Sequence, residues 1–213
     1  MTEKSKNKKS SSKKNNKVRK NLLPDSIIRF EIRISGAGGQ GIISTGMLLG
    51  EAISIGDGKN VSQSQAYGPE ARGGATRADI IISDSEIYFP ECNKIDLLVA
   101  FTDTAYEKHS AHVKQTGLII ADEHAVEMKM GTAKTLDIPF IEFAKKKFGN
   151  QIVANIIALG FVSSYTGIVS KGSIMGAVED KFENSKYLEL NLKALDFGFS
   201  LGKKYFKENP LTA

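Results

Sequence analysis

Cysteine is scarce in this chain of 213 residues, and Cys92 is the only one. A single cysteine excludes a disulfide within the chain, a four-cysteine zinc site and an iron–sulfur cluster held by this chain alone. Any clusters that the function requires must therefore come from another chain. Because no pair of basic residues flanks Cys92 to lower its pKa, we interpret it as a buried or half-buried bystander rather than a nucleophile.

The sequence also lacks the long apolar runs of membrane spans. The stretch 150–170 contains no charged residue over a length close to that of a bilayer crossing. Polar residues interrupt it, however, and Ile152, Ile156, Leu159 and Val162 recur at helical spacing. This pattern predicts a buried central helix in a soluble protein that does not contact a membrane.

Beyond the first 20 residues, basic residues are slightly fewer than acidic ones. The first 20 residues hold nine of the 29 lysines and arginines and one of the 24 acidic residues, which leaves 20 basic and 23 acidic residues in the rest. The tail has almost nothing apolar to bury, so we expect residues 1–21 to be disordered. It resembles neither a secretory signal nor a transit peptide, which favours a cytoplasmic protein. We interpret it as a solvated extension, with contact to nucleic acid or an acidic partner as the alternative.

Periodicity and glycine placement predict one domain over residues 22–213. Ile28, Phe30, Ile32 and Ile34 alternate with charged residues, which is typical of a strand over 27–35. The further elements expected are a glycine turn (36–41), a helix (42–55), a weak strand (60–65), a hairpin of strands 78–83 and 87–89, strands 96–101 and 118–122, and helices 141–148, 151–166, 173–182 and 188–207. This order predicts an α/β fold with a mainly parallel sheet, a Rossmann-like start, a β-hairpin insertion and a helical C-terminal third.

The first strand is unusual because Arg29, Glu31 and Arg33 place charges on one of its faces. Strands in the middle of a parallel sheet are normally apolar on both faces. We therefore expect this face to be open to water or covered by another subunit. Asn150 and Ser173 are the expected N-caps of the helices that they precede.

The glycine turn is the first candidate site, formed by Gly36, Gly38, Gly39, Gln40 and Gly41. It follows a strand and opens a helix, as a phosphate-binding G-x-G-x-x-G turn does. A dinucleotide site also needs an acidic residue at the end of the next strand, and that strand has none. Three interpretations stay open: a dinucleotide site, a site for another phosphate or carboxylate, and a turn that serves packing only.

Other chemistries lack their residues. Ile42 and Ile43 stand where a nucleotide P-loop needs Lys and Ser or Thr. The Gly-Asp-Gly triplet 56–58 begins like a thiamine diphosphate–magnesium site, but no paired Asn follows it, and Asp57 precedes the strand whose end a ribose would need. The three histidines, His109 and His112 on an expected helix and His124, show no metal-ligand spacing. We expect no metal site in this chain.

The second candidate site is the segment 67–74, which combines an aromatic ring, a proline, opposite charges and a glycine pair between two expected strands. One interpretation is a tight connection whose glycines supply positive φ. The other is a site in which Arg72 binds a carboxylate or phosphate, with Glu70 pairing or steering it. The candidate residues are Tyr67, Gly68, Pro69, Glu70, Arg72, Gly73 and Gly74.

Together the two motifs resemble a known family. GAGGQGI at 36–42, followed by QSQAYGPEARGGATRADIIIS at 63–83, is similar to the gamma subunit of 2-oxoacid:ferredoxin oxidoreductases, particularly the 2-oxoglutarate type. The similarity covers about residues 28–200. The resemblance implies a multi-subunit enzyme that oxidatively decarboxylates a 2-oxoacid with coenzyme A and passes electrons to ferredoxin.

The resemblance also implies a division of labour. Thiamine diphosphate and magnesium would lie with alpha and beta subunits, and iron–sulfur clusters with a ferredoxin-like delta subunit and, in some members, beta. This chain would hold no cofactor by itself and would be inactive alone. The residues of both motifs carry over as positions that build the interface near the active centre or receive substrate or coenzyme A. The alternatives are a pyruvate or indolepyruvate enzyme subunit and a stand-alone nucleotide-binding module.

Overall fold

The computed structural model describes residues 18–19, 21–67, 75–127 and 133–212, and its centre is a six-stranded sheet with the order β3-β4-β2-β5-β6-β7. The strands are β2 (Phe30–Gly36), β3 (Asn60–Ala66), β4 (Thr76–Ser83), β5 (Ile95–Ala100), β6 (Val113–Asp122) and β7 (Lys134–Ile138). β2, β5, β6 and β7 run parallel, whereas β4 is antiparallel to both β2 and β3. A separate short ladder joins β1 (Val18–Arg19) to β8 (Leu211–Thr212).

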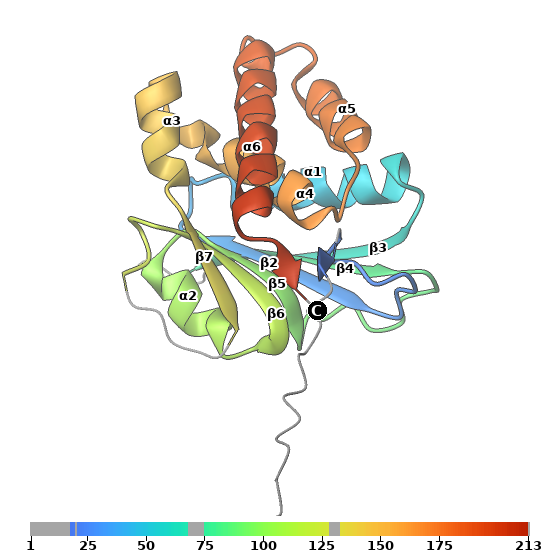
Figure 1. Cartoon of the computed structure of the whole chain (residues 1–213). Coiled ribbons are helices and arrows are strands. Elements are labelled where there is room, and N and C mark those ends of the chain that lie inside the picture. Colours follow the sequence, from blue (N-terminus) through green and yellow to red (C-terminus); the bar gives the residue numbers. More distant parts are fainter. Residues whose placement is uncertain (1–17, 20, 68–74, 128–132, 213) are drawn as a thin grey trace, which may run out of the picture.

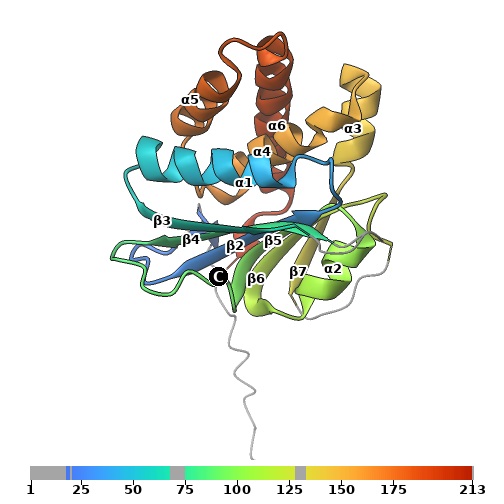
Figure 2. The same ribbon diagram turned by 180° about the vertical axis from the view of Figure 1, so that it is seen from behind.

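The helices cover the two faces of the sheet unequally. They are α1 (Ile42–Glu51), which continues as a π-helical turn (Ala52–Gly56), α2 (Asp103–Ser110), α3 (Phe140–Phe148), a 3₁₀ turn (Gln151–Val153), α4 (Ala154–Thr166), α5 (Lys171–Phe182) and α6 (Leu188–Glu208). Figures 1 and 2 show α2 on one side of the sheet and the other five helices on the opposite side. The predicted α/β fold with a helical C-terminal third is confirmed. None of the helices in the described ranges is both long and apolar enough to span a bilayer.

The antiparallel part of the sheet differs from the expected hairpin. In β4, Ile81 pairs with Glu31 of β2 on one side and with Ser62 of β3 on the other. Both edges of β4 are therefore occupied, and no edge is left for a strand at 87–89. That segment forms no strand, and its Tyr88 is 88% exposed. The expected partner of strand 78–83 was wrong, because β3 rather than 87–89 pairs with it.

The charged face of β2 is buried by this chain itself. Glu31 and Arg33 are both 4% exposed. Arg33 donates through Nε and Nη2 to the two carboxylate oxygens of Asp79 on β4, at 2.6 and 2.7 Å. Glu31 accepts the backbone N–H groups of Asn93 and Lys94, each at 2.7 Å. At these positions the expectation of a water-exposed or subunit-covered face was wrong, because β4 and the segment 93–94 supply the partners.

Two helix starts test the expected N-caps. Asn150 accepts the N–H of Ile152 at 3.0 Å and caps the 3₁₀ turn before α4, as predicted. Ser173 is not a cap: Ser170, in an extended conformation, accepts the N–H of Ser173 at 3.2 Å. The side chain of Ser173 instead donates to Asp57 at 2.6 Å. The helix thus begins earlier than the apolar pattern indicates, because the polar residue with extended backbone is Ser170.

The predicted buried helix, α4, packs against α6 at very short range. A Cβ atom at Gly160 of α4 would lie 2.3 Å from the carbonyl oxygen of Leu195, and one at Gly198 of α6 would lie 2.1 Å from that of Ile157. Backbone of each helix thus occupies the space that a side chain would need on the other. The two glycines therefore set the distance between α4 and α6, which holds α4 against the remaining core.

Replacement of Gly198 by alanine tests this contact. We expect Gly198→Ala to lower the free energy of unfolding by about 1–3 kcal/mol, because overpacking at a backbone contact forces the helices apart. Gly176→Ala in α5 is the matched control, since a Cβ there meets no atom within 4 Å. The control should be neutral or stabilising by up to about 1 kcal/mol through helix propensity. Urea titrations of both variants measure this, and equal stabilities would contradict the close approach.

Candidate functional site

Sheet register brings the two sequence motifs to one edge of the molecule. Gly36 at the end of β2 pairs with Thr76 at the start of β4, and Ala66 at the end of β3 pairs with Arg77. The glycine turn 36–41 and Tyr67 therefore leave the sheet at the same edge, which we call the motif edge. The carboxyl ends of strands at such an edge are the usual ligand positions in open α/β sheets. Gly68, Pro69, Glu70, Arg72, Gly73 and Gly74 lie outside the described residues.

The glycine turn closes on itself through Gln40. The side-chain oxygen of Gln40 accepts the N–H of Ala37 at 2.7 Å, and its backbone N–H donates to the carbonyl of Ala37 at 3.3 Å. Gly41 then enters α1 with a φ of +73° and without a side-chain cap. Gln40 thus shapes the turn, and its side-chain oxygen is engaged there rather than free for a ligand.

Packing explains some of these glycines but not all. A Cβ at Gly36 would lie 2.9 Å from Cβ of Phe101, and one at Gly41 would lie 2.2 Å from the amide nitrogen of Asn155. Gly38 is exposed, has no positive φ and would meet nothing within 4 Å if it carried a Cβ. Among the described residues, neither packing nor a positive φ therefore requires glycine at position 38.

Asn155 of α4 contacts the glycine turn through its side chain. The sequence patterns did not single this residue out. Its side chain is buried and donates to the carbonyl of Gly41 at 3.5 Å, while its oxygen accepts the N–H of Ile156 at 2.8 Å. A cavity of about 300 Å³ lies beside it, lined by residues of α1, α4 and α6. The one available signal was an amide in the first turn of a helix that contains no charged residue.

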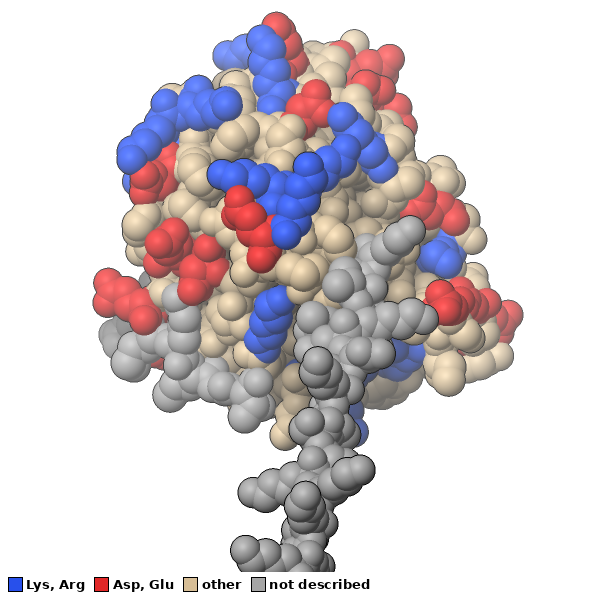
Figure 3. Space-filling view, in the orientation of Figure 1, with Lys and Arg blue, Asp and Glu red and all other residues tan. Residues whose placement is uncertain are grey.

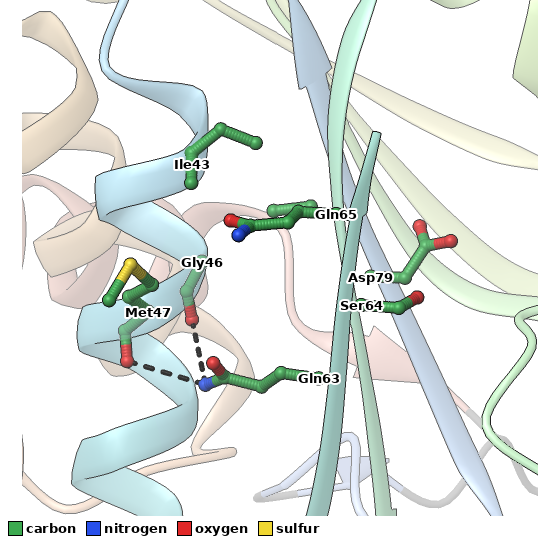
Figure 4. A pocket seen from close by; sticks show the side chains of 8 residues that line it. Ile43, Gly46, Met47, Gln63, Ser64, Gln65 and Asp79 are labelled. Atoms are coloured by element: carbon green, nitrogen blue, oxygen red, sulfur yellow. Dashed lines mark hydrogen bonds between the residues drawn. The ribbon is translucent and has the colours of Figure 1, made fainter. Parts of the chain in front are cut away.

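A smaller cavity of about 160 Å³ lies between α1 and β3. Gln63 reaches across and donates to the carbonyls of Gly46 and Met47 at 3.3 and 3.4 Å. Figure 4 shows Gln63 and Gln65 on the α1 side of β3, whereas Ser64 and Asp79 point to the other face of the sheet. Gln63 thus connects β3 to α1. The alternation of side chains along β3 and β4 directs Ser64 and Asp79 to the α2 side.

Asp57 serves the fold. It accepts the N–H of Ser170 at 2.9 Å and the hydroxyl of Ser173 at 2.6 Å, and so anchors the start of α5. Its carboxylate is therefore committed, and it fits neither a ribose nor the magnesium ion of thiamine diphosphate. Among the described residues there is no group of three or more His, Cys, Asp or Glu side chains placed to hold a metal ion.

His109 and Cys92 are buried side chains. His109 lies near the end of α2, whereas the expected place of His112 on the same helix was wrong, because α2 ends at Ser110. Burial, followed by the nearby charge of Arg33, lowers the pKa of His109 to about 3. Cys92 is buried against the carbonyl of Ile32, and burial raises the pKa of its thiol. A thiol kept in its neutral form agrees with the interpretation of Cys92 as a bystander.

Charge is mixed over the helical layer. On the face seen in Figure 3, Lys and Arg side chains alternate with Asp and Glu rather than forming a field of one sign. Binding to nucleic acid relies on clustered positive charge. This face therefore offers no support for a nucleic-acid interface.

Comparisons with known proteins agree on one relationship. The family model for pyruvate ferredoxin/flavodoxin oxidoreductase matches residues 31–201. A 2-oxoglutarate synthase subunit KorC of Methanocaldococcus jannaschii is 41% identical over 180 residues, which cover 83% of this chain and 96% of that protein.

Two solved structures share the fold. The gamma subunit of a keto/oxoacid ferredoxin oxidoreductase from Geobacter sulfurreducens has a TM-score of 0.72 and 43% identity, over 81% of this chain and 98% of that one. A 2-oxoglutarate:ferredoxin oxidoreductase from Magnetococcus marinus, solved with 2-oxoglutarate, coenzyme A and succinyl-CoA, has a TM-score of 0.74 and 26% identity. The match covers 83% of this chain and 31% of the longer Magnetococcus chain.

Alanine substitutions distinguish the glycines of the turn that packing requires from those that it does not. Gly41→Ala should destabilise the chain by about 1–3 kcal/mol, because Cβ would clash with Asn155 and the positive φ is unfavourable for alanine. Gly38→Ala should leave stability within about 0.5 kcal/mol of the native chain. Thermal unfolding of both variants measures the difference. If Gly38→Ala destabilises as much as Gly41→Ala, the packing account of this turn is wrong.

Acid titration tests the burial of His109. Its pKa in the folded chain, about 3, lies below the ordinary value of 6.5, so the unfolded chain binds an extra proton between these pH values. The free energy of unfolding should therefore fall as pH drops below about 6.5, with this contribution levelling off near pH 3. In His109→Gln this part of the pH dependence should be missing. Urea titrations at several pH values compare the two chains, and parallel profiles would contradict a neutral, buried His109.

Proposed function

The chain belongs to the pyruvate ferredoxin/flavodoxin oxidoreductase family, and on this basis we propose that it acts as the gamma subunit of a 2-oxoglutarate:ferredoxin oxidoreductase. The reaction is the oxidative decarboxylation of 2-oxoglutarate with coenzyme A, with electrons passed to ferredoxin. The observation that carries the proposal is 41% identity spread over 96% of a 2-oxoglutarate synthase subunit. Similarity at this level covers the whole relative rather than an isolated motif.

We propose that this chain depends on partner subunits for its cofactors. Enzymes of this family use thiamine diphosphate, iron–sulfur clusters and coenzyme A. One buried cysteine cannot supply a cluster, and Asp57 is committed to α5. We assign thiamine diphosphate and magnesium to alpha and beta subunits, and the clusters to a ferredoxin-like delta subunit and, in some members, beta.

The role that we propose for this chain is positioning at the motif edge. Gly38 is exposed and has no packing role among the described residues, and Tyr67, at the same edge, is 70% exposed. An exposed aromatic ring and an unobstructed backbone suit contact with another surface or with an extended ligand. We infer that this edge faces the active centre of the complex, where it contacts a partner subunit or coenzyme A.

Two further assignments complete the proposal. Residues 22–213 form the gamma-type domain, and the basic segment 1–21 precedes it, with Val18 and Arg19 paired to Thr212 and Leu211 in the β1–β8 ladder. The enzyme works in the cytoplasm, where ferredoxin is available as electron acceptor. Removal of residues 1–17, which keeps this ladder, should leave assembly with the partner subunits unchanged.

A substrate panel tests the function. The complex is recovered from the native host through a tag at the C-terminus of this chain, and coenzyme A-dependent viologen reduction is measured with 2-oxoglutarate, pyruvate, a branched 2-oxoacid and indolepyruvate. We expect kcat/KM for 2-oxoglutarate to exceed that for pyruvate by at least about a hundredfold. The groups that bind the distal carboxylate of 2-oxoglutarate have no partner when a substrate without that carboxylate is bound.

The isolated chain is the control for this experiment and should show no activity with any of the four acids. Preference for pyruvate or indolepyruvate would replace the substrate assignment. A tagged chain that returns without partners, is inactive with all four acids and binds a nucleotide tightly in calorimetry would favour the stand-alone nucleotide-binding module instead.

A further inference from the structure

A polar pocket of about 620 Å³ lies on the α2 side of the sheet, away from α1. Its walls come from β2, β4, the segment 90–93 and the end of α2. Arg77, which lines it, pairs in register with Ser35 and Ala66, one residue from the motif edge. The pocket shares Ser64, Gln65 and Asp79 with the smaller cavity between α1 and β3, and at Arg77 it comes within one residue of the edge where both sequence motifs leave the sheet.

The charges in this pocket do not balance. Asp79, 3% exposed, is shared by two arginines. Arg33 binds both of its oxygens, at 2.6 and 2.7 Å, whereas Nε of Arg77 lies 3.6 Å from Oδ2, beyond hydrogen-bond distance. Nε of Arg77 is buried and has no hydrogen-bond partner among the described residues. Two guanidinium groups on one carboxylate leave a surplus positive charge and an unused donor.

A second unused donor comes from His109, which is 2% exposed and lines the same pocket. Arg33 Nη1 lies 3.3 Å from His109 Nδ1, and an arginine can only donate. Nδ1 must therefore accept, and in a neutral imidazole the proton then resides on Nε2. The lowered pKa of about 3 keeps the ring neutral at physiological pH. Nε2 is buried and has no hydrogen-bond partner in the part of the chain that the structure describes, so it is a donor without an acceptor there.

We propose that this pocket is a binding site for a small anion that presents a carboxylate or phosphate group, held by Nε of Arg77 and Nε2 of His109. Both unused groups donate, so the ligand must accept. The surplus charge favours an anion over a neutral acceptor. Lys108 and His112 at the pocket add to this preference, and Glu91 opposes it. A volume of about 620 Å³ exceeds that of a single phosphate and admits a small organic anion.

The site can be tested on the full chain by nuclear magnetic resonance. The chain contains three histidines, so ¹⁵N-labelled histidine gives few signals, and His109 is assigned from its substitution. Phosphate, acetate and succinate are titrated separately at constant ionic strength set with chloride. We expect a saturable shift of the His109 Nε2 signal, and comparison of phosphate with the two carboxylates identifies which headgroup the site takes. No saturable shift with any of the three would overturn the proposal.

Substitutions then locate the binding. Arg77→Gln should lower the affinity for the anion at least about tenfold. Arg77→Lys should also lower this affinity, because lysine keeps the charge but loses the Nε–H donor. Lys171→Gln, a cation paired with Asp196 in the helical layer, is the matched control and should bind as the native chain does. Equal affinity in Arg77→Gln and the control would refute the site.

The same titration on the assembled complex distinguishes a ligand site from a subunit contact. We expect phosphate or a carboxylate to bind this pocket in the assembled complex as well. Loss of small-anion binding on assembly would overturn the proposal, since a partner side chain would then fill the pocket. These measurements do not use enzyme activity, so their failure would leave the proposed oxidoreductase function untouched.

Discussion

The bidentate ion pair between Arg33 and Asp79 is the interaction on which the α2 side of the sheet depends. It joins the two neighbouring strands β2 and β4 at positions that are almost free of solvent. A buried charge is costly unless its partner is well placed, and here both carboxylate oxygens are used. The pair also orients His109 through Nη1 of Arg33. Removal of either partner would leave an uncompensated charge in the interior.

This ion pair makes the two faces of the sheet chemically different. On the helical side, Ile32, Ile34, Ile80 and Ile82 form part of the main apolar core. On the α2 side, the same strands present Arg33 and Asp79, and the segment before β5 closes over Glu31. One face therefore supplies most of the hydrophobic stabilisation, whereas the other holds polar groups in fixed positions. A subunit that contributes surface rather than cofactors needs both properties.

The arrangement at the motif edge is consistent with such a role. Hydrogen bonds with Gln40 and Asn155 stabilise the glycine turn. Gly38 is exposed and has no packing role among the described residues. The polar pocket extends from Arg77, one residue from the same edge, to His109 at the end of α2. The glycine turn, an exposed tyrosine and Arg77 are thus gathered at one end of the sheet. Precise positioning of this kind is what a catalytic subunit requires from its neighbour.

The sequence by itself determined the elements and the family. Local periodicity predicted β2, α1, α4 and α6, because each is specified by residues a few positions apart, and the two motifs with their spacing indicated the oxidoreductase relationship. Tertiary structure alone decided the pairing of β4 with β3, the burial of Arg33 and the role of Asp57. Each of these depends on a partner 11 or more positions away along the chain, as the pairing of Ala66 with Arg77 and of Arg33 with Asp79 shows. A charged residue in an alternating strand can be exposed to water or buried beside a partner of opposite charge. Only the fold decides between these, because it brings the partner next to the charge.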